Sequence, residues 1–227
     1  MDNSPVLLEK LPHGVAKLTL NNPPLNLVTL ELTRHLKETL EKIEEDDKIR
    51  AVVIVGSGER AFCAGSDIKE FPQVSDNVID KKLKKENEAF SAIEFLSKPT
   101  IAAIEGIACG GGLEIALACD IRIIAENGKV GLPEVKLGVF PGSGGLFRLP
   151  RLVGPSIAME LMYLGDFIDA HEAKRIGLVN RVVPQGEALK TALELAERIA
   201  KQPFESIKAI KRGVRESFYR NHEENVQ

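Results

Sequence analysis

Glu114 is the residue in this chain most suited to chemistry, because it is an acid inside an otherwise apolar segment. It lies in GGGLEIALACD, residues 110–120, where three glycines precede the apolar run. An ionised carboxylate stripped of water costs several kcal/mol unless it is paired or protonated. Glu114 is therefore either a structural acid, paired with a buried Arg or placed at a helix start, or a catalytic group with an altered pKa.

The glycines before Glu114 could supply backbone donors. Glycine adopts positive φ and lets the backbone approach a ligand closely. A buried strand ending at residues 105–106, followed by glycines that open a helix, leaves N–H groups without intrahelical acceptors. The segment AFCAGSD, residues 61–67, also contains a glycine at the end of a buried strand. Convergent N–H groups from the two segments would form an oxyanion hole, where one donor is worth about 3–4 kcal/mol of transition-state stabilisation.

A second acid, Glu134, lies in the Pro- and Gly-rich segment VGLPEVKLGVFPGSGG, residues 130–145. It could be an ordinary surface acid near a turn. Two carboxylates beside one oxyanion hole would instead suit proton transfers on either side of a carbon next to a carbonyl. The spacing alone leaves open whether Glu114 and Glu134 meet.

Motifs of other chemistries are missing from the sequence. It has no G-x-x-x-x-G-K-[ST] phosphate loop and no G-x-S-x-G nucleophile elbow. No spacing of Cys and His is typical of a metal site, so we expect none. The three cysteines lie in apolar or Gly-rich surroundings and indicate reduced thiols. We expect the four histidines to be surface residues: His13, His35, His171 and His222.

The elements that must position these residues predict an α/β fold. Continuous β-branched runs are typical of strands buried on both faces, and helical spacing of apolar residues separates them. Such an order favours right-handed crossovers and a layered core. We predict strands over 6–11 and 15–20 (a hairpin), 51–56, 99–106 and 121–125, and helices over 29–46 and 77–97.

The chain after about residue 142 is predicted to be mainly helical. We therefore divide it into a β/α core, residues 1–145, which carries the candidate oxyanion donors and both glutamates, and a helical C-terminal region, residues 146–227. We expect helices over 155–164, 169–176, 187–201 and 204–219, and a short strand over 178–183.

Composition limits the class of protein. A chain of 227 residues can bury a substantial core, and 28% charged residues is ordinary for a soluble globular protein. The net charge of −3 gives no general reason to expect nucleic acid or an acidic membrane. No apolar run approaches the roughly 20 residues of a spanning helix. The first residues have neither a basic leader nor an apolar core, so we expect no export signal and a cytoplasmic protein, or one of an organelle matrix after removal of a targeting segment.

Three segments together resemble the crotonase superfamily, the enoyl-CoA hydratases and isomerases. They are AFCAGSDIKE (61–70), IAAIEGIACGGGLEIALACDI (101–121) and GLPEVKLGVFPGSGG (131–145), in the family's order. The resemblance spans nearly the whole chain. It implies a ClpP/crotonase fold of repeated ββα units with a helical C-terminal part, which commonly builds homotrimers or homohexamers.

The resemblance also implies roles for particular residues. The N–H groups of Ser66 and Gly111 would form the oxyanion hole, and Glu114 and Glu134 would be the catalytic acids. Such a site hydrates an enoyl thioester: Glu114 would activate the water and Glu134 would donate the proton to the α-carbon.

Coenzyme A would be part of the substrate, so the resemblance implies no separate cofactor. Gly142, expected at the start of the helix after Glu134, would orient the site with its N–H. The residues expected to contact the acyl-CoA are Ala64, Ser66, Asp67, Ile68, Gly111 and Gly142.

Four alternatives remain open at this point. A Δ3,Δ2-enoyl-CoA isomerase typically uses one glutamate, so the presence of both favours hydration. Other members of the family perform hydrolysis, decarboxylation or ring chemistry on acyl-CoA with the same oxyanion hole. A few crotonase-like proteins bind RNA through a basic helix, and KKLKK (81–85) is the only feature here that would support this. We expect that run to be a solvated helix face or to lie near the coenzyme's phosphates. A catalytically silent scaffold would not need the glutamate pair.

Two features depart from the family pattern. Leu146-Phe147-Arg148 stands where hydratases often have Thr-Gln-Arg, which predicts a more apolar inner wall of the acyl pocket. The sequence also stops at NHEENVQ, about one helical segment earlier than expected. Either it is incomplete or its pocket is more open than usual.

Overall fold

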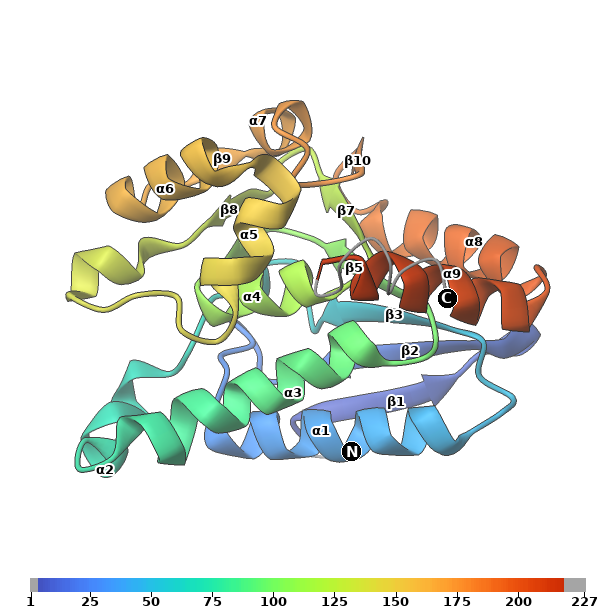
Figure 1. Cartoon of the computed structure of the whole chain (residues 1–227), viewed down its shortest axis with the longest axis horizontal. Helices are drawn as coiled ribbons and strands as arrows, with labels where there is room; N and C mark the ends of the chain where they lie inside the picture. Colours follow the sequence, from blue (N-terminus) through green and yellow to red (C-terminus); the bar gives the residue numbers. More distant parts are fainter. Residues whose placement is uncertain (1–3, 219–227) are drawn as a thin grey trace.

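The computed structural model describes residues 4–218, which form two β-sheets surrounded by helices (Figure 1). The strands of the larger sheet, in spatial order, are β1 (Val6–Lys10), β2 (Val15–Leu20), β3 (Ala51–Gly56), β5 (Thr100–Ile104), β7 (Ile121–Ala125) and β10 (Arg181–Val183). The strands of the smaller sheet are β4 (Ala61–Cys63), β6 (Ile107–Cys109), β8 (Lys129–Gly131) and β9 (Ile168–Asp169).

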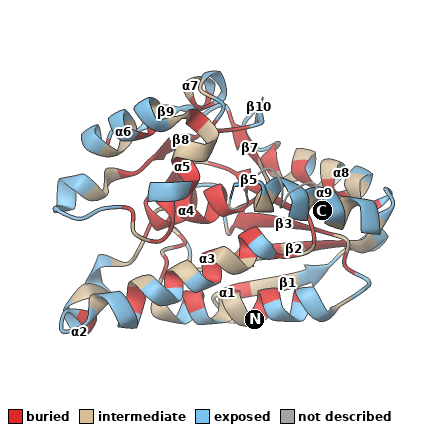
Figure 2. Cartoon of the chain, viewed as in Figure 1, coloured by how far each residue is buried: buried red, intermediate tan, exposed pale blue. Residues whose placement is uncertain are grey.

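The larger sheet confirms the predicted strands. β1 and β2 form an antiparallel hairpin, and the pairs from β2 to β10 are parallel. Every residue of β3 and β5 is buried, as their apolar sequences indicate (Figure 2). Alternate side chains belong to different core clusters: Val52 and Ile54 to one, Val53 and Val55 to the other. The sheet therefore separates two apolar layers.

The smaller sheet reveals a ββα repeat. The strands β3, β5 and β7 of the larger sheet are each followed by a three-residue strand of the smaller sheet and then by a helix. The three helices are α3 (Lys84–Phe95), α4 (Gly111–Ala118) and α5 (Gly145–Val153). The repeat confirms the crotonase fold. The short strands were absent from the sequence prediction because three residues are too few for an alternating pattern to be recognised.

Helices α1 (Leu30–Glu45) and α3 lie side by side over one face of the larger sheet. Thr29 caps α1: its hydroxyl accepts a hydrogen bond from the N–H of Leu32 at 3.0 Å. The predicted helix over 77–97 is a π-helical segment, η3 (Ile79–Leu83), continued by α3. Before it come η2 (Ile68–Glu70) and α2 (Phe71–Val74).

The other face of the larger sheet is covered by α8 (Ala188–Ala200). Its buried residues are alanines four positions apart: Ala188, Ala192, Ala196 and Ala200. Side chains at this spacing share one helix face, and their small size lets the helix pack closely on the sheet.

The C-terminal region is helical, as predicted, with a 3-10 turn before it, η4 (Pro133–Leu137). Its other helices are α6 (Pro155–Leu164), α7 (Ala170–Arg175) and α9 (Phe204–Glu216). The main apolar core contains Leu149, Val153 and Leu178 together with residues of the first 145, so the two predicted regions share one core. Helix α5 begins at Gly145, so the prediction that a helix starts at Gly142 is wrong by three residues.

Several other expectations can be compared with the structure. His13 and His171 are exposed and His35 is partly exposed, whereas His222 lies outside the described residues, as does NHEENVQ. The three cysteines are free thiols and buried. Over residues 4–218, no helix combines the length and the apolar character needed to cross a membrane.

Candidate active site

The segment after β4 and the start of α4 place two backbone amides next to each other. Ser66 pairs with Val28: the N–H of Val28 donates to the Gly65 carbonyl, and the N–H of Asp67 donates to the Val28 carbonyl, both at 2.9 Å. A Cβ added to Gly111 would lie 3.7 Å from the Ser66 nitrogen. Within residues 4–218, neither the Ser66 nor the Gly111 amide donates a hydrogen bond to another group. Both donors are therefore available to one acceptor.

Glycine is required where the chain enters α4. Gly110 has φ of +52°, which L side chains rarely adopt. A Cβ on Gly112 would overlap the backbone carbonyl of Cys63. The glycines thus let the first turn of α4 pack directly on β4, which brings Gly111 to Ser66.

Glu114 lies in that first turn and is 2% exposed. Its Oε1 accepts a hydrogen bond from the N–H of Gly145 at 2.8 Å. The pKa of Glu114 is raised to about 8, chiefly by burial; the hydrogen bond from the Gly145 N–H lowers it, the charges of Glu134 and Glu86 raise it, and Arg148 lowers it. Among the described residues no basic side chain lies within ion-pair distance of Glu114. The ion-pair explanation for this buried acid is therefore wrong.

Glu134 comes to the same place from η4. Its Oε1 lies 3.3 Å from where a Cβ on Gly110 would be, so the carboxylate faces the entrance of α4. Its Oε2 is buried and has no hydrogen-bond partner within residues 4–218. Burial raises the pKa of Glu134 as well. A buried oxygen without a partner is an acceptor available to a bound water or substrate.

The structure thus brings together four of the predicted residues: Ser66, Gly111, Glu114 and Glu134. Gly142 is different, because it lies before α5 and its carbonyl accepts from Asn87 Nδ2 at 3.2 Å. The amide at the start of α5 that reaches a glutamate belongs to Gly145, which the sequence reasoning missed. The pair Gly144-Gly145 before an apolar run was the available signal of a helix start.

The remaining predicted contact residues follow Cys63. Ala64 donates its N–H to the Leu25 carbonyl at 2.9 Å, and Asp67 caps η2 by accepting from Lys69 N–H at 3.0 Å. The Ile68 side chain is 62% exposed. This segment leads from the paired amides to the surface, and its contact with coenzyme A remains a prediction.

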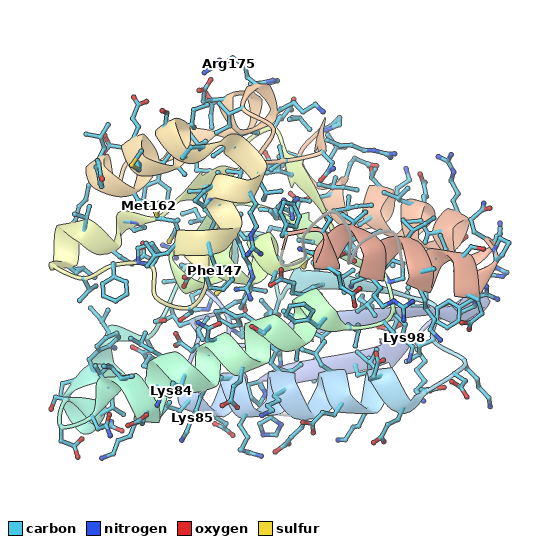
Figure 3. The ribbon with its side chains drawn as sticks, viewed as in Figure 1. Lys84, Lys85, Lys98, Phe147, Met162 and Arg175 are labelled. Carbon is cyan, nitrogen blue, oxygen red and sulfur yellow. The ribbon has the colours of Figure 1, made fainter. Side chains whose placement is uncertain are left out.

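The KKLKK run is not a uniform solvated face. Lys81, Lys84 and Lys85 are exposed, and Figure 3 shows Lys84 and Lys85 on the outer side of the helix. Lys82 is completely buried and pairs with Glu86 at 3.2 Å. The expectation of a solvated face is therefore wrong at Lys82. The sequence held a signal of this, because positions 82, 86, 90 and 93 share one helix face with apolar residues.

The chain matches the family model described as enoyl-CoA hydratase/isomerase over residues 10–227. The chain belongs to that family. It is 41% identical to the short-chain-enoyl-CoA hydratase of Clostridium acetobutylicum, over 94% of this chain and 82% of that one. It is 42% identical to a crotonyl-CoA hydratase of Syntrophomonas wolfei, over 86% and 75% of the two chains.

Two solved structures show the same fold. An enoyl-CoA hydratase from Bacillus anthracis superposes with a TM-score of 0.94, with 38% identity over 98% of this chain and 87% of that chain. DspI of Pseudomonas aeruginosa gives a TM-score of 0.93, with 38% identity over 97% and 84% of the two chains. The recognition of the crotonase superfamily from three sequence segments is confirmed.

The three residues that depart from the family pattern, Leu146-Phe147-Arg148, lie in the first turn of α5. Leu146 is 50% exposed, and Phe147 lies at the surface with its ring 4.7 Å from the Arg148 guanidinium (Figure 3). Their contact with an acyl chain remains a prediction. Arg148 is buried instead and donates to Glu94 Oε2 at 2.8 Å.

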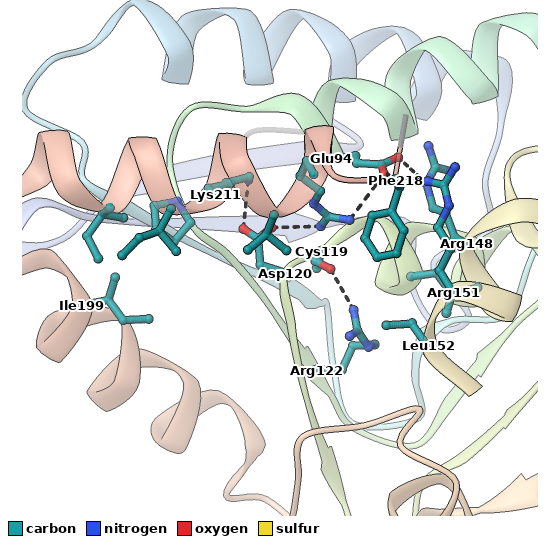
Figure 4. A pocket seen from close by; sticks show the side chains of 16 residues that line it. Glu94, Cys119, Asp120, Arg122, Arg148, Arg151, Leu152, Ile199, Lys211 and Phe218 are labelled. Carbon is teal, nitrogen blue, oxygen red and sulfur yellow. Dashed lines mark hydrogen bonds and ion pairs between the residues drawn. The ribbon is translucent and has the colours of Figure 1, made fainter. Parts of the chain in front are cut away.

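A large apolar cavity lies away from the glutamates. It has a volume of about 370 Å³ and lies between α9 and the body of the chain (Figure 4). Only Leu117 of α4 lines it, at the opposite end of the helix from Gly111. Ion pairs of Asp120 with Lys211 and Arg215, at 2.8 and 2.9 Å, lie along it.

Within residues 4–218, no cluster of three or more His, Cys, Asp or Glu side chains could hold a metal ion.

Proposed function

We propose that this chain is an enoyl-CoA hydratase, which adds water across the 2,3 double bond of an enoyl-CoA to give a 3-hydroxyacyl-CoA. The observation that carries the proposal is the pair of carboxylates, buried Glu114 and half-buried Glu134, beside the adjacent amides of Ser66 and Gly111. Family membership and relatives named as short-chain-enoyl-CoA and crotonyl-CoA hydratases support it.

The thioester carbonyl oxygen is bound between the N–H groups of Ser66 and Gly111. Two donors in a water-poor site stabilise the negative charge that develops on this oxygen as the β-carbon is attacked. The coenzyme A moiety runs along Ala64, Asp67 and Ile68 toward the surface. Coenzyme A is part of the substrate, and the reaction needs no separate cofactor.

The carboxylate pair handles the water and the proton. A water between Glu114 and Glu134 loses a proton to one carboxylate as its oxygen bonds to the β-carbon. The other carboxyl group protonates the α-carbon, so the pair begins and ends with a single proton. Glu114 is assigned to the water and Glu134 to the α-carbon. Burial favours the protonated form of Glu114 in the free protein. Because this assignment needs an ionised Glu114 and a protonated Glu134, the shared proton must first pass from Glu114 to Glu134 through the bound water.

The main alternative is isomerisation of a 3-enoyl-CoA to the conjugated 2-enoyl-CoA. Isomerisation needs one carboxylate to move a proton, and would give the second acid of the pair no function. The unpartnered Oε2 of Glu134 favours hydration, because a positioned water can donate a hydrogen bond to this oxygen. RNA binding has less support, since the basic run includes the buried Lys82.

The first test follows the absorbance of the conjugated enoyl thioester with crotonyl-CoA and longer 2-enoyl-CoAs. We expect rapid loss of absorbance, reduced about 100-fold or more in Glu114→Gln and in Glu134→Gln, the scale expected of general acid–base groups. Glu126→Gln, an exposed acid after β7, is the matched control and should keep full activity. Appearance of the conjugated absorbance from a 3-enoyl-CoA, without hydration at any chain length, would make the protein an isomerase.

A second measurement separates the roles of the two acids. Exchange of the α-protons of butanoyl-CoA with deuterium from heavy water requires only the group that serves the α-carbon. We expect Glu134→Gln to abolish this exchange and Glu114→Gln to retain it. The reverse result, read by mass spectrometry, would exchange the two roles.

The protein acts as a homo-oligomer, a trimer or a pair of trimers, through its helical C-terminal region. The reduced, buried cysteines agree with a location in the cytoplasm or an organelle matrix.

A further inference from the structure

Another buried carboxylate, Glu86 of α3, lies beneath the site and takes no part in the proposed reaction. It is 1% exposed and both of its oxygens are engaged. Ser66 Oγ donates to Glu86 Oε1 at 3.1 Å, and Ser143 Oγ donates to Glu86 Oε2 at 2.7 Å. One carboxylate therefore connects two loops that come from different ββα units.

Lys82 provides the positive charge for this group. Its Nζ, fully buried, lies 3.2 Å from Glu86 Oε1 and 3.0 Å from Glu70 Oε2. Glu70 in turn accepts hydrogen bonds from the N–H of Leu30 at the start of α1, at 3.0 and 3.1 Å. An unpaired ion that loses its water costs several kcal/mol. A network of two acids and one base is therefore a costly way to fill a space that apolar side chains could also fill.

The two serines are directly linked to the groups of the reaction. Ser66 carries one of the oxyanion amides, and its Oγ lies 3.2 Å from where a Cβ on Gly111 would be. Ser143 precedes Gly145, whose N–H holds Glu114, by two residues. The Ser143 carbonyl also accepts from Arg148 Nη1 at 3.0 Å, so the side chain and the backbone of this residue are both fixed.

We propose that Glu86 is a positioning residue, which fixes the oxyanion amide of Ser66 relative to the Glu114 carboxylate by holding Ser66 and Ser143 at once. The inference rests on the proposed function. Misplacement of reacting groups by about 1 Å can cost on the order of 100-fold in rate, so a tether of this kind acts on kcat more than on binding.

Glu86 also contributes to the electrostatics of the site. The groups that face Glu114 are Glu86 from α3, Glu134 from η4, and Arg148 with the Gly145 N–H from α5. The negative charge of Glu86 raises the pKa of Glu114. Removing this charge while keeping the shape should therefore lower the pH above which the pair has lost its last proton.

The test compares Glu86→Gln with Ser143→Ala and with Glu88→Gln, an exposed acid of the same helix. Gln keeps the size of Glu86 but replaces one of the two accepting oxygens with an NH2 group, which cannot accept the hydrogen bond from a serine hydroxyl, and it removes the charge that pairs with Lys82. We expect Glu86→Gln to lower kcat for crotonyl-CoA about 10- to 100-fold with KM changed less than about 3-fold. The upper limb of its kcat–pH profile should move to lower pH. Ser143→Ala should lower kcat by a smaller factor, with the upper limb in place, and Glu88→Gln should match the parent in both.

A folded Glu86→Gln with the kcat and pH profile of the parent would overturn the inference. If that variant does not fold, Ser143→Ala decides, and an unchanged kcat there would overturn the inference. If the parent hydrates no enoyl-CoA, the proposed function fails separately. The positioning role of Glu86 is then measured with acetoacetyl-CoA, whose enolate absorbance reports binding in the oxyanion hole. A weaker enolate absorbance in Glu86→Gln than in the parent supports the positioning role, and an equal absorbance overturns it.

Discussion

At the residue scale, the state of Glu114 is set by what surrounds it rather than by its spacing to other acids. Within residues 4–218 its carboxylate accepts one hydrogen bond, from the Gly145 N–H, and the residue is 2% exposed. A single neutral donor does not replace the water lost on burial, so the protonated form is favoured. The same burial that makes Glu114 able to hold a proton at neutral pH makes the ionised form costly for the fold.

This cost predicts a pH-dependent effect of Glu114→Gln on stability. The unfolded chain loses the proton near pH 4.5 and the folded chain near pH 8, so the folded state binds more protons between these values. The free energy of unfolding due to this group therefore falls as pH rises through that window. We expect Glu114→Gln to be more stable than the parent above pH 8, by several kcal/mol at most, with the gain vanishing near pH 4.5. Urea unfolding at pH 5, 7 and 9 measures it; a pH-independent difference would contradict the assigned cause.

At the element scale, the contact between α4 and β4 depends on a missing side chain. The first turn of α4 packs on the backbone of Cys63 at Gly112. The separation of the Ser66 and Gly111 amides depends on this contact. The glycine triplet is therefore a packing requirement as well as a source of amide donors.

Gly112→Ala tests the contact. We expect it to destabilise the protein by about 1–3 kcal/mol, through overpacking against the Cys63 carbonyl, and to reduce activity. The matched control is Gly213→Ala in α9, where an added Cβ meets nothing within 4 Å. That substitution should stabilise the protein by about 0.4–1 kcal/mol, through a less flexible unfolded chain. Equal effects of the two substitutions in thermal unfolding would exclude the close packing of α4 on β4.

The helices and long strands were predictable because their patterns extend over five or more residues. The strands of the smaller sheet, such as Ala61–Cys63, are too short for this and form through pairing with distant strands. At the site, the motifs predicted Ser66, Gly111, Glu114 and Glu134. The contribution of Glu86 to the site was not predicted, because its partners Ser66 and Ser143 lie 20 and 57 residues away in the sequence. Such contacts form only in the folded chain.

At the scale of the whole molecule, apolar side chains gather on the surface of η4, α5, α6 and the loop between η4 and α5. Leu137, Phe140 and Leu164 are each more than half exposed. Single exposed apolar residues are ordinary, whereas many on neighbouring elements indicate an interaction surface. The exposed fractions refer to one chain, and the proposed self-association would cover part of this surface.

Light scattering measures the assembly directly. For a chain of 24.8 kDa we expect a mass three or six times as large, stable on dilution through the micromolar range. Replacing Leu137 and Leu164 by Ser should shift the population toward single chains, whereas Ile68→Ser, exposed on η2, should not. A parent protein with the mass of one chain would contradict the proposed self-association.

The ββα repeat also divides the groups of the proposed reaction among separate pieces of sequence. The unit that begins with β3 supplies the Ser66 amide, the β5 unit supplies Gly111 with Glu114, and the β7 unit supplies Glu134. Exchange of one acid therefore leaves the carbonyl-binding donors of the other units in place. Proteins built on this repeat can therefore change the reaction by substitution in one unit while the units that bind the thioester keep their sequence.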